Sequence, residues 1–335
     1  MDRPVAVLVL AVGGNVGQGI LKSLAHDRRP LRILGADIAP LQMGLYTVEK
    51  AFVSPWAYEE AFLPYLLDLC KREQVDIILS GAEPVLLAMA QHQQEIREVT
   101  GARCLCSPLN ILEVCDDKLL TCQWLEREGL PHPAYADGAD HEAVTRLVAQ
   151  VGFPLVAKPR HGGGARGLFL VHDQHDLDYI IRKPDYVIQE SVGTDETEYT
   201  VGCMRQKDGK LAESCCMRRD LASGTTFRAV LGEFTEVRRV AESITSALKP
   251  VGPCNIQLRM TERGPVCFEI NPRFSGTTPI RTHLGYPEVS AALDHFLEEA
   301  PIDLPRITEG VALRYWNELY PAGEAVVALE QVGRL

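Results

Sequence analysis

The sequence lacks the features that would mark a membrane-spanning, secreted or zinc-binding protein. No apolar run approaches the ~20 residues that a helix needs to cross a bilayer. The early apolar run at residues 5–12 ends in glycines and has no small-residue cleavage pattern, so we interpret it as a buried strand. The ten cysteines are scattered, and neither Cys104/Cys106 nor Cys215/Cys216 has the CxxC spacing of a zinc site. We therefore expect a cytoplasmic protein with reduced thiols.

Positive charge is also scarce. The formal net charge of −11 and the pI near 5.4 argue against a general role on nucleic acids or membrane surfaces. The remaining composition, 46% hydrophobic and 24% charged, is ordinary for a globular protein. A chain of 335 residues is long enough for two or three domains.

The first third of the chain alternates between strand-like and helix-like segments. Such alternation is typical of an α/β fold in which helices cover both faces of a parallel, Rossmann-like sheet. The predicted strands span residues 5–12, 31–37, 76–80 and 102–106, and the predicted helices span residues 16–27, 58–73 and 83–97.

The remainder of the chain has an α+β pattern of hairpins and fewer helices. It contains no internal repeat, low-complexity tract or long linker, so we expect interlocked domains. A helix near residues 117–128 is followed by predicted strands at 154–159, 168–172, 186–189, 197–206 and 210–218, a hairpin at 254–270, and helices at 174–182, 235–248 and 287–298.

Residues 266–273, Val-Cys-Phe-Glu-Ile-Asn-Pro-Arg, carry the most chemistry in one short stretch. They alternate like a half-buried strand, with a proline and an arginine directly after it. The period of two places Val266, Phe268 and Ile270 on the core face and Cys267, Glu269 and Asn271 on the opposite face. Carboxylate and amide oxygens suit Mg²⁺, and an arginine beside them suits a transferring phosphoryl group. The alternative is a solvated strand face closed by a turn.

A glycine-rich loop follows a predicted strand that ends in Lys158. Residues 162–167 contain four glycines, and Arg160 and Arg166 accompany them. Glycines let backbone N–H groups close on phosphate oxygens, and a lysine adds a point charge. The loop lacks the G-x-x-x-x-G-K-[ST] pattern of a Walker A loop. The alternative is a surface turn within a hairpin, but the lysine and the arginines favour phosphate binding.

Two weaker signals lie nearby. Asp117 is suited to cap a helix that begins at Lys118, which is a sufficient structural reason for it. A buried strand ends at Gln189-Glu190, and Glu198 follows eight residues later. Such a strand can offer backbone groups to a base edge and a carboxylate to ribose hydroxyls, although each segment alone is more typical of ordinary structure.

The order of these segments resembles the ATP-grasp superfamily, and in particular its carbamoyl-phosphate-synthase-like branch. The resemblance covers about residues 1–300 and lies in the combination, because each motif alone is weak. It is carried by Asp117-Lys118, Ala157-Lys158-Pro159 with its glycine loop, Gln189-Glu190 with Glu198, Gln257, and Glu269-x-Asn271-Pro272-Arg273.

The resemblance implies roles for individual residues in binding ATP and Mg²⁺, with Mn²⁺ as a substitute. Lys118 and Lys158 would contact ATP phosphates, beneath a flexible loop that includes Gly163, Gly164 and Arg166. Gln189, Glu190 and Val192 would read adenine, and Glu198 would bind the ribose. Glu269, Asn271 and Gln257 would bind the metal. Arg273 would hold the γ-phosphate and the acyl phosphate, which makes Arg273, Lys158 and Asn271 the implied catalytic residues.

Gln257 departs from the pattern of many ATP-grasp enzymes, which carry a carboxylate there. Glutamine is known at this position in the carbamoyl-phosphate branch, so the resemblance stands. The departure weakens the case for two fully ligated metal ions. It predicts a site in which Glu269 and the nucleotide's own oxygens hold Mg²⁺.

The amino-terminal loop, Gly13-Gly14-Asn15-Val16-Gly17-Gln18-Gly19, admits two interpretations. It follows a strand and opens a helix, with Asp37 at the end of the next strand, as in dinucleotide-binding proteins. Its spacing is not a clean G-x-G-x-x-G, and the amino-terminal domain of ATP-grasp enzymes has a similar unit without NAD. We therefore favour a role in substrate binding and assign Gly14, Asn15, Glu83 and Arg281 to the substrate side.

These observations lead to an expected function. The resemblance implies a ligase that joins a carboxylate to an amine or other nucleophile through an acyl phosphate, with ATP converted to ADP. It implies a Rossmann-like domain at 1–114, a central ATP-grasp subdomain at 115–190 and a carboxyl-terminal subdomain with the metal site at 191–335. It also implies small-molecule substrates, and homodimers are common among such enzymes. The alternatives are bicarbonate or carbamate phosphorylation, an NAD-dependent oxidoreductase, and a nucleotide-binding module without turnover.

Overall fold

The computed structural model describes residues 3–335, and its first sheet is parallel throughout. The strand order is β3-β2-β1-β4-β5. Every residue of the central strand β1 is buried, as expected for a parallel sheet covered on both faces. The strands are β1 (Val5–Leu10), β2 (Leu31–Asp37), β3 (Lys50–Val53), β4 (Ile77–Ser80) and β5 (Arg103–Cys104), and the helices are α1 (Asn15–Leu24), α2 (Phe62–Glu73), α3 (Glu83–Gln91) and α4 (Gln93–Thr100), with a 3-10 turn η1 (Met43–Thr47).

A small antiparallel sheet of order β6-β9-β7-β8 follows. Two helices lead into it, and the Asp117 side chain caps the second by accepting from Leu119 N at 2.9 Å. The strands are β6 (Tyr135–Asp137), β7 (Leu155–Pro159), β8 (Phe169–Val171) and β9 (Tyr186–Glu190), and the helices are α5 (Leu109–Asp116), α6 (Lys118–Arg127), α7 (His141–Val151) and α8 (Gln174–Ile180).

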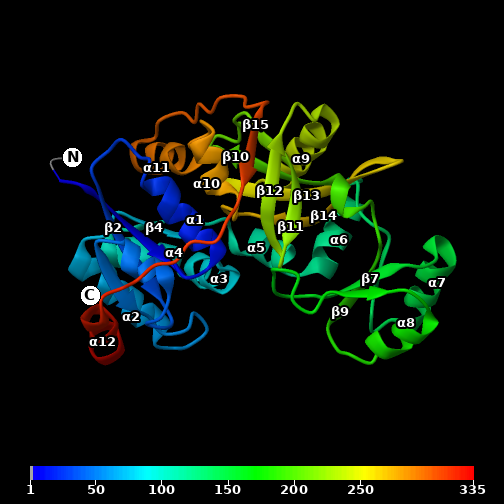
Figure 1. The fold of residues 1–335 in the computed structure, drawn as a ribbon, viewed down its shortest axis with the longest axis horizontal. Helices are drawn as coiled ribbons and strands as arrows, with labels where there is room; N and C mark the ends of the chain where they lie inside the picture. Colours follow the sequence, from blue (N-terminus) through cyan, green and yellow to red (C-terminus); the bar gives the residue numbers. More distant parts are fainter. Residues whose placement is uncertain (1–2) are drawn as a thin grey trace.

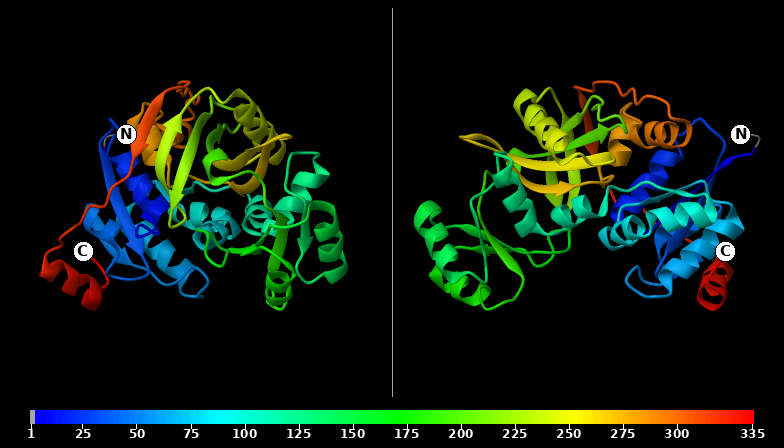
Figure 2. Two further views of the ribbon diagram at one scale, coloured as in Figure 1. Left: turned by 45° about the vertical axis from the view of Figure 1, so that its right-hand side comes forward. Right: turned by 180° about the vertical axis from the view of Figure 1, so that it is seen from behind.

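The third sheet is antiparallel, with order β14-β13-β10-β11-β12-β15. It joins the other two sheets, which lie on opposite sides of the molecule in Figure 1 and again from behind in Figure 2. Its strands are β10 (Glu198–Arg205), β11 (Cys215–Ala222), β12 (Thr225–Leu231), β13 (Gly252–Thr261), β14 (Gly264–Asn271) and β15 (Gly310–Leu313), accompanied by η2 (Asp195–Thr197), α9 (Thr235–Leu248), α10 (Thr278–His283) and α11 (Glu288–Glu298).

The last segment returns to the first sheet. It crosses the molecule as the red trace of Figure 1, forms α12 (Gly323–Val332) and runs along β3. Val53 N donates to Gly333 O at 2.8 Å, and Leu335 N donates to Ala51 O at 2.8 Å. The predicted carboxyl-terminal subdomain, residues 191–335, therefore includes a segment that packs on the amino-terminal sheet.

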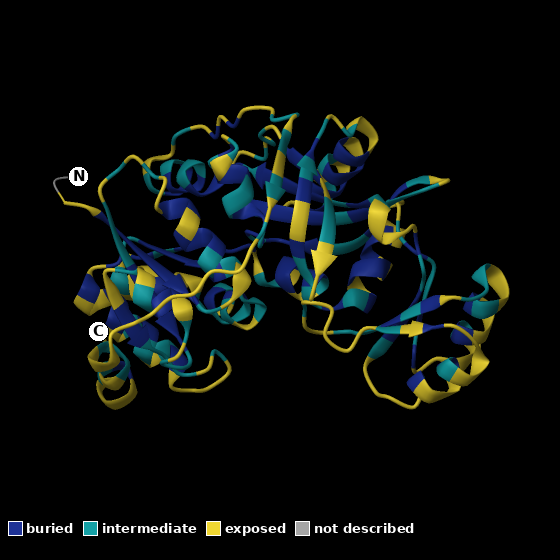
Figure 3. Ribbon diagram, in the orientation of Figure 1, coloured by how far each residue is buried: buried dark blue, intermediate teal, exposed yellow. Residues whose placement is uncertain are grey.

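Buried residues concentrate in the sheets and on the helix faces that cover them (Figure 3). All ten cysteines are buried and unpaired. No helix within residues 3–335 is long and apolar enough to cross a membrane. The predicted helix 83–97 is instead two helices, because the chain leaves helical geometry at His92. Strands β3, β6 and β15 were not predicted, because three or four residues give a short pattern, and the seven-residue β12 was missed as well.

Candidate functional site: a cleft between three sheets

A cleft of about 1020 Å³ lies where the three sheets meet, and most of the predicted site residues line it. The amino-terminal domain contributes the start of α1 and the start of α3, while the small sheet contributes β7, the glycine loop and the end of β9. Fifteen of the predicted site residues line the cleft: Gly14, Asn15, Glu83, Lys118, Lys158, Gly163, Gly164, Arg166, Gln189, Glu190, Val192, Glu198, Gln257, Glu269 and Arg273. The other two, Asn271 and Arg281, lie behind its wall.

The glycine loop is closed onto the start of α6. Lys118 Nζ donates to Gly162 O at 2.6 Å, and Lys118 N donates to Arg160 O at 2.9 Å. Gly162 and Gly164 have φ values of 91° and 70°, a backbone region that side chains rarely adopt. The glycines that marked this loop in the sequence are therefore explained by its backbone geometry.

Lys158 lies at the end of β7 with its ammonium 4.9 Å from the Phe268 ring centroid. Burial lowers the pKa of Lys158 below its usual range, and the nearby Glu269 carboxylate opposes this only in part. A lysine whose charge is poorly compensated by the protein is suited to bind an anion that enters the cleft.

The alternation predicted for residues 266–273 is wrong at two positions. The pairing of β13 with β14 shifts register after Gln257, so that Gln257 faces Glu269 while Leu258 faces Cys267. This β-bulge leaves Phe268 as the extra residue and changes which side chains share a face. Phe268, predicted in the core, lines the cleft beside Glu269, whereas Cys267 is fully buried in the core.

Glu269 is the centre of a small polar cluster on β13 and β14. Gln257 Nε2 donates to Glu269 Oε1 at 3.0 Å, and Asn271 Nδ2 donates to the same oxygen at 2.9 Å. No group of three or more acidic, histidine or cysteine side chains suited to a metal occurs in residues 3–335. Glu269 Oε2 accepts no hydrogen bond from the described side chains or backbone, which leaves it available to a cation. One carboxylate fits a single Mg²⁺ that takes its other ligands from phosphate oxygens and water.

The predicted ribose ligand, Glu198, is already engaged by two arginines. Arg219 Nη2 donates to Glu198 Oε1 at 2.8 Å, and Arg259 Nη2 donates to Oε2 at 2.8 Å. Both arginines line the cleft, and the sequence reasoning missed them. A signal for Arg259 was present, because it lies two residues after Gln257 on β13 and so shares a strand face with it.

Strand β9 ends in two polar side chains that form hydrogen bonds within the protein. Gln189 is buried, and its Nε2 donates to Cys122 Sγ at 2.9 Å. Glu190 Oε2 accepts from Ala134 N at 3.1 Å and forms an ion pair with Arg263. The backbone between Glu190 and Val192 borders the cleft, where it can offer hydrogen bonds to a flat ligand.

Arg273 and Glu83 form an ion pair between the turn after β14 and the start of α3. Arg273 Nε donates to Glu83 Oε1 at 2.7 Å, and Arg273 Nη1 donates to Phe274 O at 2.9 Å. Burial alone would raise the pKa of Glu83, but the Arg273 guanidinium outweighs it and leaves that pKa below its ordinary value. Glu83 therefore holds Arg273 in a fixed place beside Glu269 and the start of α1.

Asp37 does not line the cleft, which disfavours the dinucleotide interpretation of the first loop. Its Oδ2 accepts from Gly13 N at 2.7 Å, and its Oδ1 accepts from Ile38 N at 2.8 Å. The carboxylate that would bind a ribose in a dinucleotide-binding protein therefore stabilises the loop itself. Asn15 instead approaches Gly276 so closely that a Cβ at Gly276 would collide with its side-chain amide.

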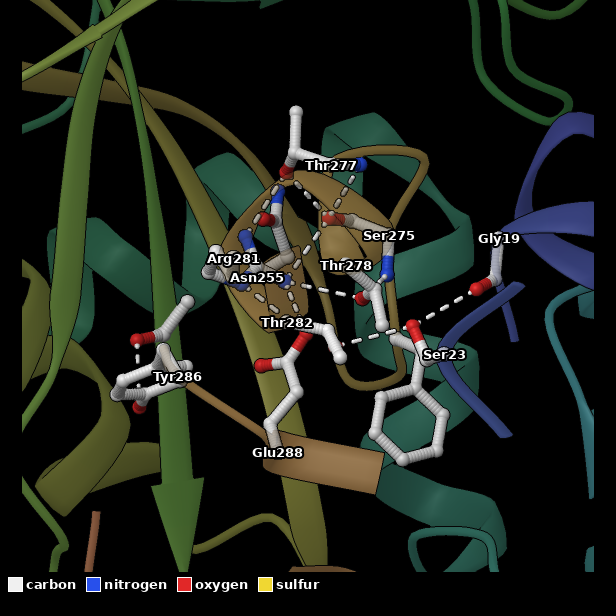
Figure 4. Close-up of polar contacts among 12 residues, drawn as sticks. Gly19, Ser23, Asn255, Ser275, Thr277, Thr278, Arg281, Thr282, Tyr286 and Glu288 are labelled. Carbon is white, nitrogen blue, oxygen red and sulfur yellow. Dashed lines mark hydrogen bonds and ion pairs between the residues drawn. The ribbon is translucent and has the colours of Figure 1, made fainter. Parts of the chain in front are cut away.

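The predicted substrate contact of Arg281 is wrong. Its side chain is 1% exposed, and it lies behind the cleft wall in the network of Figure 4. Arg281 Nη2 donates to Glu288 Oε1 at 2.6 Å, and its Nη1 donates to Thr277 Oγ1 at 2.8 Å. Burial alone would lower the pKa of Arg281, but Glu288 keeps it above its ordinary value. Arg281 therefore supports the loop that carries Ser275 and Thr277, both of which line the cleft.

Two sequence families match separate parts of the chain. Residues 7–102 match the PylC-like N-terminal domain, and residues 183–319 match the family described as ATP-grasp in the biosynthetic pathway with Ter operon. The carbamoyl phosphate synthase large chain of Rubrobacter xylanophilus is 25% identical over 329 residues, which cover 89% of this chain and 30% of that protein. The chain thus spans less than a third of this relative's length.

Solved structures share the fold. The N5-carboxyaminoimidazole synthetase of Staphylococcus aureus matches with a TM-score of 0.74 at 13% identity, over 99% of this chain and 86% of that one. The L-amino acid ligase of Bacillus licheniformis matches with a TM-score of 0.67 at 17% identity, over 89% and 75%. These likenesses confirm the predicted fold class, a Rossmann-like parallel sheet followed by an α+β ATP-grasp unit. With the ATP-grasp family that matches residues 183–319 and the carbamoyl phosphate synthase relative that covers 89% of this chain, they show that the chain is similar to ATP-grasp proteins.

Proposed function

We propose that the chain is an ATP-dependent ligase that joins a carboxylate to an amine through an acyl phosphate. The observation that carries this proposal is the single cleft in which Lys118, Lys158, the glycine loop, Glu269 and Arg273 come together. These are the groups that phosphoryl transfer needs, because that chemistry requires positioning and charge neutralisation more than covalent help. The similarity to ATP-grasp proteins supports the same proposal.

The described side chains have distinct tasks in this reaction. Lys118 and Lys158 neutralise ATP phosphates, and the glycine loop closes over them with backbone donors. The substrate carboxylate attacks the γ-phosphorus, and the bond from that phosphorus to the β,γ-bridging oxygen breaks to release ADP. Arg273 stabilises the charge on the transferring group. The amine then attacks the acyl carbon, and phosphate leaves.

Mg²⁺ fits the carboxylate of Glu269, which has one oxygen unoccupied by hydrogen bonds from the described residues. When bound, the ion would neutralise charge on the β- and γ-phosphates. Glu269 itself is held in place by the Gln257 and Asn271 side chains, which both donate to its other oxygen. Asn271 therefore positions Glu269 from behind the cleft wall.

The substrate side of the cleft is built from the loop before α1, the start of α3 and the 275–277 loop. Gly14, Asn15 and Glu83 border it together with Ser275 and Thr277. Backbone N–H groups at the start of α1 suit a carboxylate. The carbamoyl phosphate synthase relative favours one second candidate, in which the phosphorylated acid is bicarbonate or carbamate.

A phosphate-release screen tests the proposal. Purified protein with Mg·ATP is offered amino acids, small carboxylates and bicarbonate, singly and in pairs, and products are identified by mass. We expect ADP and phosphate only with a particular acid, and a condensed product when an amine is added. Binding of NADH without any ATP-dependent thermal shift would refute the ligase. ATP binding without turnover across the whole screen would favour a nucleotide-binding module.

The pKa of Lys158 predicts that ATP binding takes up a proton at alkaline pH. Burial lowers this pKa in the free protein, and bound phosphates would raise it again. Affinity for ATP is then constant at lower pH and falls by up to about tenfold per pH unit as pH rises through the lowered pKa. Titration calorimetry in two buffers of different ionisation enthalpy measures the uptake. Lys158→Arg should abolish it, and Lys210→Arg, at an exposed lysine, should not.

Replacing Glu269 by glutamine should raise the Mg²⁺ concentration that nucleotide binding requires. Glu269 is the carboxylate at the centre of the polar cluster, so its loss leaves the ion only nucleotide and water ligands. We expect the Mg²⁺ concentration for half-maximal thermal stabilisation by ATP to rise about tenfold to a hundredfold. Glu262→Gln, in the exposed β13–β14 turn, is the matched control. An unchanged requirement in Glu269→Gln would place the metal elsewhere.

A further inference from the structure

Both amides in the Glu269 cluster have their carbonyl oxygens occupied by arginines. Gln257 Oε1 accepts from Arg219 Nη2 at 2.6 Å, and Asn271 Oδ1 accepts from Arg273 Nη2 at 2.8 Å. A guanidinium can only donate and an ionised carboxylate can only accept. The partners therefore fix both amides with the oxygen toward arginine and the NH₂ group toward Glu269. A metal could bind either amide oxygen only by sharing it with a guanidinium.

The Arg219 side chain is mostly buried in the cleft wall and is held there by hydrogen bonds. Its side chain, on β11, is 10% exposed. Its Nε and Nη2 donate to Glu198 Oε1 at 3.0 and 2.8 Å. Arg259 donates to the other oxygen of Glu198 and also pairs with Asp195 at 2.6 Å, so the two arginines and the two carboxylates balance, while the ion-pair partner of the Arg219 charge is Glu198. That charge borders the cleft beside Gln257.

A second divalent ion would have poor ligands and a repulsive neighbour here. Beyond Glu269, the cluster offers only the two amides, and described residues elsewhere supply no acidic group of three or more. A cation on Gln257 Oε1 would share that oxygen with the Arg219 guanidinium, so two positive charges would lie within a few ångströms of each other. Displacing Arg219 would also break its bonds to Glu198.

We propose that Arg219 supplies the positive charge that a second metal ion would bring, so that the site works with one divalent cation per bound nucleotide. The inference rests on the proposed function, because the charge it assigns is directed at ATP phosphates. Arg219 lines the cleft, its Nη1 donates only the long bond of 3.4 Å to Thr226 Oγ1 among the described residues, and its charge is constant over the whole physiological pH range. Gln257 then links Arg219 to Glu269 and positions both.

Manganese stoichiometry tests the inference without requiring turnover. Mn²⁺ is titrated into protein saturated with a non-hydrolysable ATP analogue, and free Mn²⁺ is measured by electron paramagnetic resonance. We expect one Mn²⁺ per bound nucleotide, and two would overturn the inference while leaving the proposed function intact. Failure of the analogue to bind at all, with or without Mn²⁺, would overturn the proposed function and this inference with it.

Paired variants show whether Arg219 is the cause. In Gln257→Glu the new carboxylate should pair with Arg219, and the stoichiometry should stay at one. In Arg219→Gln combined with Gln257→Glu, the freed carboxylate should bind a second Mn²⁺. Two ions in the single variant, or one in the double variant, would contradict the role of Arg219.

The loss of the arginine alone should weaken nucleotide binding. Arg219→Gln removes a charge-assisted contact, so we expect the affinity for the analogue to fall about tenfold to a hundredfold at one Mn²⁺ per nucleotide. Arg228→Gln is the matched control, because Arg228 lies on the next strand, is exposed and pairs only with Asp220 at 3.8 Å. Equal affinities in the two variants would overturn the inference.

Discussion

Arg273→Ala is expected to abolish most ATP turnover while leaving ATP binding largely in place. The side chain is held by Glu83, Asn271 Oδ1 and Phe274 O beside Glu269. A donor fixed in this way needs no reorganisation when charge develops on the transferring phosphoryl group, and removing one such donor typically costs about 10²–10³ in turnover. Phosphate release at saturating substrate measures the loss, and the thermal shift with Mg·ATP measures binding.

Two further variants separate the role of Arg273 from a structural one. Arg273→Lys keeps the charge but loses the forked geometry, so it should recover only part of the activity. Arg306→Ala is the control, because Arg306 is an exposed arginine paired only with Glu233. Full turnover in Arg273→Ala would contradict the assigned role. A loss of ATP binding equal to the loss of turnover would show that Arg273 serves binding alone.

The chemistry of the cleft was predictable where it depends on local pattern. Lys158 lies four residues before the glycine loop, and Glu269, Asn271 and Arg273 follow one another at intervals of two, so each motif can be recognised within one short segment. The bulge at Phe268 could not be predicted from the alternation of residues 266–273. It is a property of how β14 pairs with β13, and the sequence of β14 alone does not show that pairing. Periodicity within one strand cannot report how its neighbour is registered.

The two most consequential arginines outside the motif depend on partners far away in the sequence. Arg219 meets Glu198 and Gln257 only because β10 lies between β11 and β13 in the sheet. Arg281 has the spacing of a helix-surface residue, but its guanidinium lies against Gly202 of β10, while Thr282 on the same helix donates to Ser23 Oγ of α1 at 3.1 Å (Figure 4). Burial of a charge is set by such packing, so a single segment gives no sign of it.

Among the residues that support the 275–277 loop, replacing one partner of the buried Arg281–Glu288 ion pair should lower the free energy of unfolding most. Both side chains are 1% exposed, and Arg281 also donates to Ser275 Oγ and Thr278 Oγ1, each at 3.1 Å. Arg281→Met would leave the Glu288 carboxylate buried without its cation, which typically costs about 3–5 kcal/mol. The free energy of unfolding in urea measures this cost.

Removing both charges should restore most of that stability, because the penalty comes from the unpaired carboxylate rather than from the missing attraction. A buried ion pair replaced by apolar side chains of similar volume is often neutral. We therefore expect Arg281→Met with Glu288→Leu to unfold near the wild-type urea concentration, yet to bind ATP and substrate less well, because Ser275 and Thr277 lose the guanidinium that orders their loop. Arg306→Met, at an exposed pair, should leave the free energy of unfolding nearly unchanged. If Arg281→Met loses no more unfolding free energy than this control, the buried pair does not support the 275–277 loop. If the KM of the double variant is unchanged, the loop keeps its shape without the Arg281 guanidinium.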